Sequence, residues 1–509
     1  MQLALRNLSE DAKIRAQTFV TKSNRLWGIV YDNINFTLRK SSQRLDSATQ
    51  QINATTLAVF SLPKKFTRVA YGAALSIFER RKGSGLRRLL TPESLFPDDN
   101  KNSQVISAFK HALRTILLTR LPGKMAKRHH TRPLRKLTKK MKPKIRQLSS
   151  EKTQFFPLPA LNEEESSVGG TIRVVEKIFT TLLGLAVELV ESELRLLVGD
   201  WLTIRNLRLM KDERRDEFSS FLRFDWVQES AMPFHFQLNA MYMLFRTHLG
   251  TVSQANPSSL EHHRHLLRRS KLDIKKPEYN KAKELVMHSL IARLLDCTRC
   301  VSIISHRFQI NMQYRYFNNR IVLGEKSVND LKDWKPDCAE FELVVDQVIT
   351  RFATSSAAYD ALEAGDEVFA HSILFIRDSL FFWEFCDAIR DADVGRMWVV
   401  YDFWVFMMRG AGCHNYGNEI LEMKAQFQYE FPELLREVVE RTWLVNRWGK
   451  KGCSIPTDLY LEHNNGFTKV WFSSSSVKAN YILLPTEHVC GNGELCFHCP
   501  CSRKILCMR

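Results

Sequence analysis

The chain has 509 residues, of which 44% are hydrophobic, so it can hold several domains and is too apolar to be disordered throughout. Its formal net charge of +19 comes from the first 150 residues, which hold 31 Lys and Arg against 8 Asp and Glu. The rest of the chain is slightly acidic, with 43 basic and 47 acidic side chains. This asymmetry favours a polyanionic partner, either a nucleic acid or an anionic membrane surface.

The sequence gives little support for secretion or for a membrane span. The first fifteen residues are polar and mixed in charge. The most apolar run, Met397 to Met408, is twelve residues long and contains Asp402, which we expect to be a buried, hydrogen-bonded acid. An odd number of cysteines, eleven, is typical of reduced thiols in the cytosol or nucleus. We therefore expect no membrane partner.

The first predicted element is a short β-rich strand, Leu26 to Tyr31, which ends where Asp32 and Asn33 can bond their own backbone. Residues 101–150 contain fifteen Lys and Arg and no acid, with two prolines in the densest part. Like charges without compensation predict an extended or partly disordered arm. Residues 154–165 contain Pro and acids and are predicted to be a linker.

Hydrophobic periodicity then predicts alternating helices and strands up to residue 250 and mostly helices beyond it. In chain order we predict a helix over 171–191, a strand over 194–198, a helix over 201–213, a strand over 224–227 and a helix over 233–249. Residues 280–450 are helical in pattern, and residues 456–470 form one more amphipathic helix. The tail after Ser473, with four serines and then many cysteines, does not continue this pattern.

Three acids at element ends suit metal-dependent chemistry: Asp32 and Asp200 each end a predicted strand, and Glu462 lies on the last helix. Two Mg²⁺ ions about 3.5–4 Å apart can activate a water molecule and stabilise a leaving oxygen at a phosphodiester. Such hard cations take carboxylate oxygens as ligands. Because the chain has 55 acids, several must fall at strand ends by chance, so solvated or capping acids are the alternative.

A dense basic run is the candidate nucleic-acid contact. Contacts of Lys and Arg with phosphates give strong, salt-dependent binding that is blind to sequence, and such a run also resembles a nuclear-localisation patch. A solvated arm without a partner is the alternative. The run comprises Lys124, Lys127, Arg128, Arg132, Arg135, Lys136, Lys139, Lys140, Lys142, Lys144 and Arg146.

Two groups of cysteines have spacings that suggest zinc, which needs four nitrogen or sulfur ligands. Cys490, Cys496, Cys499 and Cys501, with His498 as an alternative ligand, could supply them in the tail. Cys297 and Cys300 form a CxxC pair inside a helical pattern. Neither spacing fits a standard zinc finger, so we favour free thiols in both places.

Four sequence blocks give more weight to the acids. Residues 198–203 (VGDWLT) are similar to a GDQLT signature, residues 234–239 (FHFQLN) to FHLQMN, and residues 458–465, with Lys469 beyond, to DLYLEHLNRxxK; residues 415–419 fit a further block. From about Trp27 to about Trp471 the chain therefore resembles the mainly fungal family filed as domain of unknown function 6589. That family is thought to derive from cut-and-paste DNA transposases.

The resemblance implies an α/β core of the ribonuclease H-like type, a mixed sheet flanked by helices, with a large all-α insertion in a helix-rich chain. Such a core carries its first acid on the first strand, its second after the fourth strand and its third on a later helix, which is the order of Asp32, Asp200 and Glu462. The implied divisions are the start of the core at 1–100, the basic arm at 101–153, the rest of the core at 154–250, the insertion at 251–450, the last core helix at 451–472 and the Cys-rich tail at 473–509.

The implied activity is hydrolysis and strand transfer at DNA phosphodiesters. Asp32 and Asp200 would bridge Mg²⁺ or Mn²⁺ ions, and Glu462 would complete the site. Glu419 is the alternative third acid, although an acid in a first helical turn is commonly placed there by the helix dipole. Glu462 is preferred because Asp458 and other polar residues surround it on an otherwise apolar helix. His235 is either a satisfied core histidine or a donor that lines the site.

Two features count against an active enzyme: Trp201 stands where the signature has Gln, and the basic arm separates Asp32 from Asp200. The alternative is a non-catalytic nucleic-acid-binding or scaffolding protein, a decayed or domesticated transposase. Both interpretations imply a DNA partner and a nuclear location, and both leave homo-oligomers open. Convergence of the three carboxylates would favour the enzyme.

Overall fold

The computed structural model describes residues 2–38, 50–82, 84–121, 123–252, 258–306 and 325–474. At its centre are five strands: β1 (Trp27–Leu38), β2 (Gln50–Ser61), β3 (Phe155–Leu161), β4 (Arg195–Gly199) and β5 (Val227–Ala231). They form one mixed sheet in the order β3-β2-β1-β4-β5. β2 is antiparallel to both of its neighbours, whereas β1, β4 and β5 are parallel to one another.

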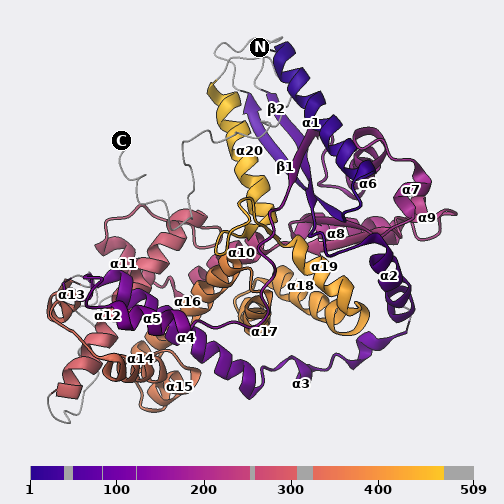
Figure 1. Cartoon of the computed structure of the whole chain (residues 1–509). Helices are drawn as coiled ribbons and strands as arrows, with labels where there is room; N and C mark the ends of the chain where they lie inside the picture. Colours follow the sequence, from indigo (N-terminus) through magenta and orange to yellow (C-terminus); the bar gives the residue numbers. More distant parts are fainter. Residues whose placement is uncertain are drawn as a thin grey trace.

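Helices flank this sheet (Figure 1). α1 (Gln2–Lys22) packs against β3, α8 (Trp201–Glu213) against β4 and β5, and α20 (Thr457–Ser474) against β1 and β2. The other helical elements before residue 250 that lie between or after the strands are α2 (Arg68–Lys82), α6 (Val168–Lys177), the π-helical turn η2 (Ile178–Leu182), α7 (Val187–Glu191), α9 (Ser220–Arg223) and α10 (Pro233–His248).

The central strands are apolar on both faces because helices cover both. Ile29 and Val30 of β1 and Leu197 and Val198 of β4 are fully buried, as expected for parallel strands in the middle of a covered sheet. β4 ends at Gly199, where an added Cβ would lie 2.6 Å from the side chain of Thr203. This close approach lets the chain turn directly from β4 into α8.

Most of the remaining helices lie below the sheet in Figure 1. They are α4 (Asp99–Arg120), α5 (Arg132–Lys140), α11 (Leu260–Leu266), α12 (Tyr279–His306), α13 (Glu325–Leu331), α14 (Cys338–Phe352), α15 (Ser355–Glu363), α16 (Glu367–Asp391), α17 (Val394–Gly410), α18 (His414–Ala425), the π-helical turn η5 (Gln426–Glu430) and α19 (Glu433–Thr442). Short elements complete the described chain: the 3₁₀ turn η1 (Leu86–Leu89), α3 (Pro92–Leu95), β6 (Leu444–Val445) and β7 (Ile455–Pro456).

The sheet and the helices share one hydrophobic core. A single cluster of buried side chains runs from α1 through the sheet to α20. Aromatic rings join the two parts: Phe236 of α10 packs against Tyr401 of α17 at 4.9 Å and against Tyr416 of α18 at 5.0 Å between ring centroids. Among the described residues, no helix combines the length and the apolar character that crossing a membrane requires.

The predicted element types are largely confirmed. The strands predicted at Leu26 and at residue 194 are β1 and β4, and the helices predicted over 201–213, 233–249 and 456–470 correspond to α8, α10 and α20. The mostly helical pattern after residue 280 is confirmed as well.

Two of the predicted boundaries are wrong. The helix expected over 171–191 breaks at Gly184, which has a left-handed backbone with φ of 63°. The strand expected at residue 224 starts at Val227, because Phe224 is also left-handed, with φ of 56°, and ends α9.

The expectation of an extended basic arm and a linker is also wrong. Residues 101–140 fold largely as α4 and α5, and the linker contains the sheet strand β3. α4 buries an apolar face and packs against α14 and α16. Its basic side chains meet acids from far along the chain, for example Lys110 with Asp346 at 2.5 Å and Lys101 with Asp402 at 2.8 Å. Asp402 is buried and also pairs with Lys424, so it is the hydrogen-bonded acid that the sequence predicts.

Candidate active site

Asp32 and Asp200 occupy the same level on two neighbouring parallel strands. The last paired residues of β1 and β4 are Val30 and Val198, and each acid lies two residues farther along. Because parallel strands advance together, this register puts the two acids side by side. Asp200 is the N-cap of α8, where its Oδ1 accepts a hydrogen bond of 2.8 Å from the backbone N–H of Thr203.

Glu462 reaches Asp32 from the helix that crosses β1. The two carboxyl groups share a hydrogen bond, and the pKa of Asp32 lies well above its ordinary value. Burial is the main cause, the negative charge of Glu462 is the next, and Asp200 adds to it, while His235 acts in the opposite direction. All three acids that the sequence singles out therefore act on one another electrostatically.

Asn465, one turn beyond Glu462 on α20, fixes this helix against the sheet. Its side chain is 1% exposed. Its Nδ2 donates to Asp32 Oδ2 at 3.4 Å, and its Oδ1 accepts from the hydroxyl of Thr56 on β2 at 2.8 Å. The Thr56 hydroxyl is also 3.1 Å from the backbone oxygen of Asp32. The position of Glu462 over Asp32 is thus set by buried polar contacts to two strands.

His235 and Asp458 form a second polar pair next to the acids. Asp458 accepts from the backbone N–H groups of Phe234 and His235 at 3.3 and 3.2 Å, so it caps α10 from the start of α20. It also lies 2.9 Å from Nδ1 of His235. Burial lowers the pKa of His235, but the hydrogen bond and charge of Asp458, with the charges of Asp200 and Asp32, raise it from 6.5 to about 9. His235 is therefore a cation that faces the acids at neutral pH.

Glu165, in the turn between β3 and α6, is a fourth acid that the sequence reasoning missed. It is 3% exposed, and its Oε1 accepts from the hydroxyl of Thr203 at 3.2 Å. Burial raises its pKa well above the ordinary value, and the charges of Asp32 and Asp200 raise it further. The composition of residues 154–165 predicts a linker and so draws attention away from this acid. An acid placed directly between a strand and the Ser167 N-cap of a helix is the signal that could have found it.

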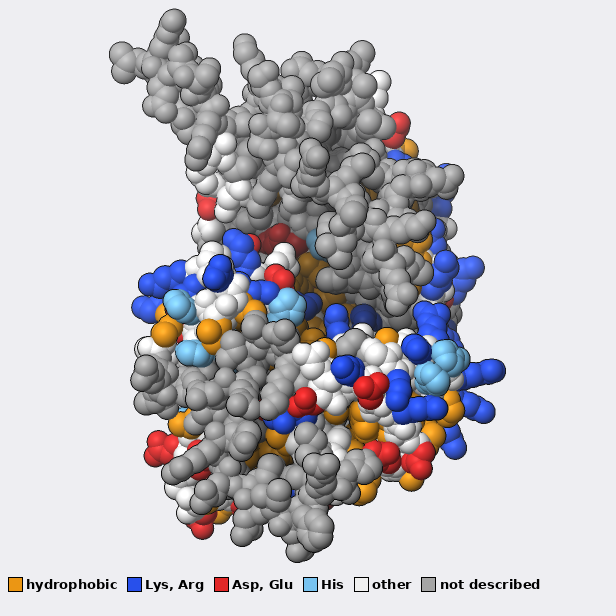
Figure 2. All heavy atoms as spheres, turned by 90° about the vertical axis from the view of Figure 1, so that its left-hand side faces the viewer, with side chains coloured by type: hydrophobic (Ala, Val, Ile, Leu, Met, Phe, Trp, Pro, Cys, Tyr) orange, Lys and Arg blue, Asp and Glu red, His pale blue; other side chains and the backbone are white. Residues whose placement is uncertain are grey.

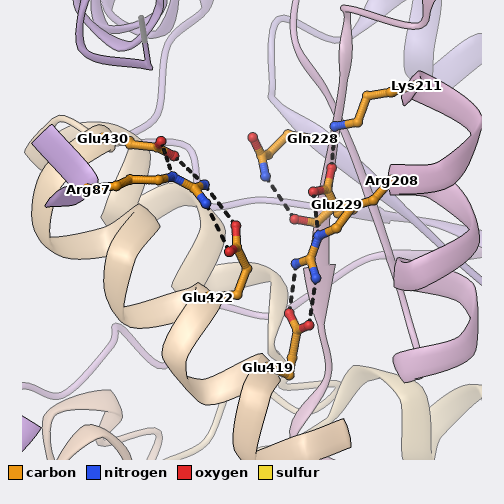
Figure 3. Close-up of polar contacts among 8 residues, drawn as sticks. All are labelled: Arg87, Arg208, Lys211, Gln228, Glu229, Glu419, Glu422 and Glu430. Carbon is orange, nitrogen blue, oxygen red and sulfur yellow. Dashed lines mark hydrogen bonds and ion pairs between the residues drawn. The ribbon is translucent and has the colours of Figure 1, made fainter. Parts of the chain in front are cut away.

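Glu419, the alternative third acid, points to a different group (Figure 3). Its two carboxylate oxygens accept from Arg208 of α8 at 2.7 and 2.8 Å. Arg208 also pairs with Glu229 of β5 at 3.0 Å, and Glu229 pairs with Lys211 at 2.5 Å. Glu419 therefore ties α18 to α8 through a buried ion pair, and it is not one of the charges that shift the pKa of Asp32.

The donor chemistry of the site suits a hard divalent cation, because it consists of carboxylates that raise one another's pKa. The side-chain arrangement does not itself form a metal site. Within the described ranges, no group of three or more His, Cys, Asp or Glu side chains has a geometry that could hold one metal ion. The Asp32 and Glu462 carboxyl groups bond to each other instead.

The basic run is divided between internal ion pairs and exposed cations. Lys142 pairs with Asp391 at 2.5 Å, Arg146 pairs with Glu440, and Lys124 lies 3.7 Å from Asp333. Arg135 donates to the backbone oxygen of Leu118 at 2.7 Å. The other seven side chains of the run are exposed: Lys127, Arg128, Arg132, Lys136, Lys139, Lys140 and Lys144. Figure 2 shows Lys and Arg gathered on both sides of a hollow in which acidic side chains are visible.

The cysteines give no support to zinc where the structure describes them. Cys297 and Cys300 are buried free thiols in α12. Cys490, Cys496, Cys499 and Cys501 lie outside the described residues.

Comparison with known proteins identifies the family of the chain but no relative of known activity. No curated protein and no solved structure matches it. Residues 85–491 match a family that is described as a family of unknown function, DUF6589. The match contains Asp200 and Glu462 and begins after Asp32. Because it covers most of the 509 residues, the chain belongs to the DUF6589 family.

Proposed function

We propose that the chain is a DNA-processing enzyme of the transposase type, with a ribonuclease H-like core that cuts and joins phosphodiesters using Mg²⁺ or Mn²⁺. The observation that carries the proposal is the shared level of Asp32 and Asp200 on β1 and β4, with Glu462 bonded to Asp32. Support also comes from the strand order β3-β2-β1-β4-β5, in which only β2 runs against the others, because that is the arrangement expected of this fold.

In this proposal the chain's own residues supply the ligands, the orientation and the charge of the site. Asp32, Asp200 and Glu462 would hold the metal ions, which when bound lower the pKa of water and stabilise the leaving oxygen. Asn465 and Thr56 orient Asp32, and Asp458 orients His235. The positive charge of His235 is suited to neutralising a phosphate oxygen that enters beside the acids.

The exposed basic residues around α5 suit the DNA backbone. Lys136, Lys139 and Lys140 project from one short helix without being used in the internal ion pairs of Lys142 and Arg146. A set of exposed cations binds successive phosphates through release of counterions and needs no base contact. A DNA substrate would in turn put the protein in the nucleus.

A non-catalytic DNA-binding protein is the second candidate. It is favoured by the observation that no described group of three metal-binding side chains is arranged around one point. The exposed residues of the basic run would serve this function equally well. The two candidates differ in one property, which is whether cleavage depends on the three acids.

The test is a nicking assay on supercoiled DNA with Mg²⁺ or Mn²⁺. Asp200→Asn and Glu462→Gln should each reduce cleavage by about 100-fold or more, because each removes a ligand charge, while DNA binding stays unchanged. Glu419→Gln is the matched control on a neighbouring helix, and it should retain cleavage once its folding is verified. Cleavage that survives Asp200→Asn, or that no metal supports, would leave the non-catalytic candidate as the better account.

A further inference from the structure

We propose that the carboxylate of Glu165 is a fourth metal ligand, acting with Asp32 and Asp200 on a hard divalent cation. This inference rests on the proposed function and extends it to a residue that the sequence blocks do not contain. It is drawn from three features of Glu165: how its backbone is fixed, what its two carboxylate oxygens contact, and which charges surround it.

The backbone of Glu165 is bonded to the neighbours of the other acids. Its N–H donates to the side-chain oxygen of Asn33, which follows Asp32, at 3.4 Å. Its carbonyl oxygen accepts from Asn206 of α8 at 2.8 Å and from the hydroxyl of Thr171 at 3.1 Å. The loop closes tightly, since a Cβ on Gly170 would lie 1.9 Å from the carbonyl oxygen of Glu164. Glu165 is therefore held at a fixed place between β1 and α8.

The two carboxylate oxygens of Glu165 differ in their surroundings. Oε1 accepts from the hydroxyl of Thr203, and the backbone N–H of this same threonine donates to Asp200 Oδ1. Thr203 thereby sets Glu165 and Asp200 side by side. Oε2 is buried and has no hydrogen-bond partner. A buried polar atom without a partner costs roughly 1–3 kcal/mol, so this oxygen calls for an explanation.

A cation provides that explanation. Glu165 is surrounded by like charges, because Asp32 and Asp200 both act on it. A divalent ion bonded to Oε2 would give this oxygen a partner and would neutralise neighbouring carboxylates at the same time. Anchoring the loop is the structural alternative, but it needs only Oε1 and the backbone contacts and leaves Oε2 unused.

The experiment measures Mn²⁺ binding to the full chain by calorimetry and, separately, the rise in melting temperature that Mn²⁺ produces. Glu165→Gln keeps an oxygen that can accept from Thr203 and removes the charge. Glu164→Gln is the matched control, since its carboxylate is the exposed neighbour in the same loop. We expect Glu165→Gln to weaken Mn²⁺ affinity by about tenfold or more and to reduce the Mn²⁺-induced rise, whereas Glu164→Gln changes neither.

Two further variants separate the outcomes. Glu165→Asp keeps the charge but withdraws the oxygens, so it should also weaken Mn²⁺ binding, and it carries the test if Glu165→Gln does not fold. Asp32→Asn reports on the site as a whole. Unchanged Mn²⁺ affinity in both Glu165 variants, with a clear loss in Asp32→Asn, would overturn this inference and leave the proposed function in place. Absence of Mn²⁺ binding by the unaltered chain would overturn both.

Discussion

The carboxylate of Asp458 lies 2.9 Å from Nδ1 of His235 and joins the first turn of α20 to the first turn of α10. The same carboxylate accepts the backbone N–H groups of Phe234 and His235, so one side chain both caps a helix and orients an imidazole. Four residues along α20 is Glu462, which bonds Asp32. The charge on His235 and the place of Glu462 thus depend on one short stretch of helix.

Asp458→Asn should return the pKa of His235 from about 9 toward its ordinary value of 6.5. The amide keeps one oxygen that can accept a hydrogen bond but loses the negative charge that holds the imidazolium. An NMR titration of the His235 ring measures this change. Asp378→Asn is the matched control, because Asp378 lies 2.9 Å from a different imidazole, that of His248. An unchanged His235 pKa in Asp458→Asn would refute the assigned cause.

Glu229→Gln should remove part of the pH dependence of stability in acid. Burial raises the pKa of Glu229, but the charges of Lys211 and Arg208 outweigh it and lower the pKa from 4.5 to about 2. Because the folded-state value is depressed, the stabilisation is complete above pH 4.5 and is lost as the pH falls toward 2. Its size at neutral pH is roughly 3 kcal/mol at about 1.4 kcal/mol per pKa unit.

The melting temperature of Glu229→Gln and of the unaltered chain, measured from pH 2 to pH 7, tests this account. The difference between them should be large at pH 7 and should shrink in acid. Glu422→Gln, which removes a partner of Arg87 whose side chain is 28% exposed, should cost about 0–1 kcal/mol at every pH. A difference for Glu229→Gln that is as large at pH 2 as at pH 7 would contradict the prediction.

Thr56 and Asn465 should be energetically coupled. Asn465→Ala removes a buried partner of the Thr56 hydroxyl and should destabilise the fold by about 1–3 kcal/mol. Thr56→Val removes the hydroxyl, so the double variant should cost less than the sum of the single ones, by about 0.5–1.5 kcal/mol. Denaturant unfolding of the four proteins measures the coupling. Additive costs would mean that the 2.8 Å contact does not hold α20 to β2.

Charge reversal of Lys136, Lys139 and Lys140 should flatten the salt dependence of binding to duplex DNA. The slope of log affinity against log salt should fall by roughly one unit for each phosphate that α5 no longer binds. Reversal of Lys450 and Lys451, two exposed lysines in a separate loop, is the control and should change the slope less per charge. An unchanged slope in the α5 variant would reject this helix as the DNA-binding element.

The local sequence determined which segments are strands and helices around the site, and it pointed to the main acids. The apolar runs before Asp32 and Asp200 predict β1 and β4, because strands covered on both faces need continuous hydrophobic residues. The turn from Gly199 through Asp200 into α8 is equally local, since the N-cap contact to Thr203 spans three residues. Glu462 is indicated by its family block and by the polar residues around it.

The tertiary structure alone decided which charges meet. Asp346 and Asp391 neutralise Lys110 and Lys142 from more than two hundred residues away, so a segment whose composition predicts an arm folds as helices. Arg208 engages Glu419, and Thr203 brings Glu165 beside Asp200. Hydrophobic periodicity records which face of each element is buried, and this can be read within one element. The partner of a buried charge comes from wherever the chain returns, and no local pattern contains that information.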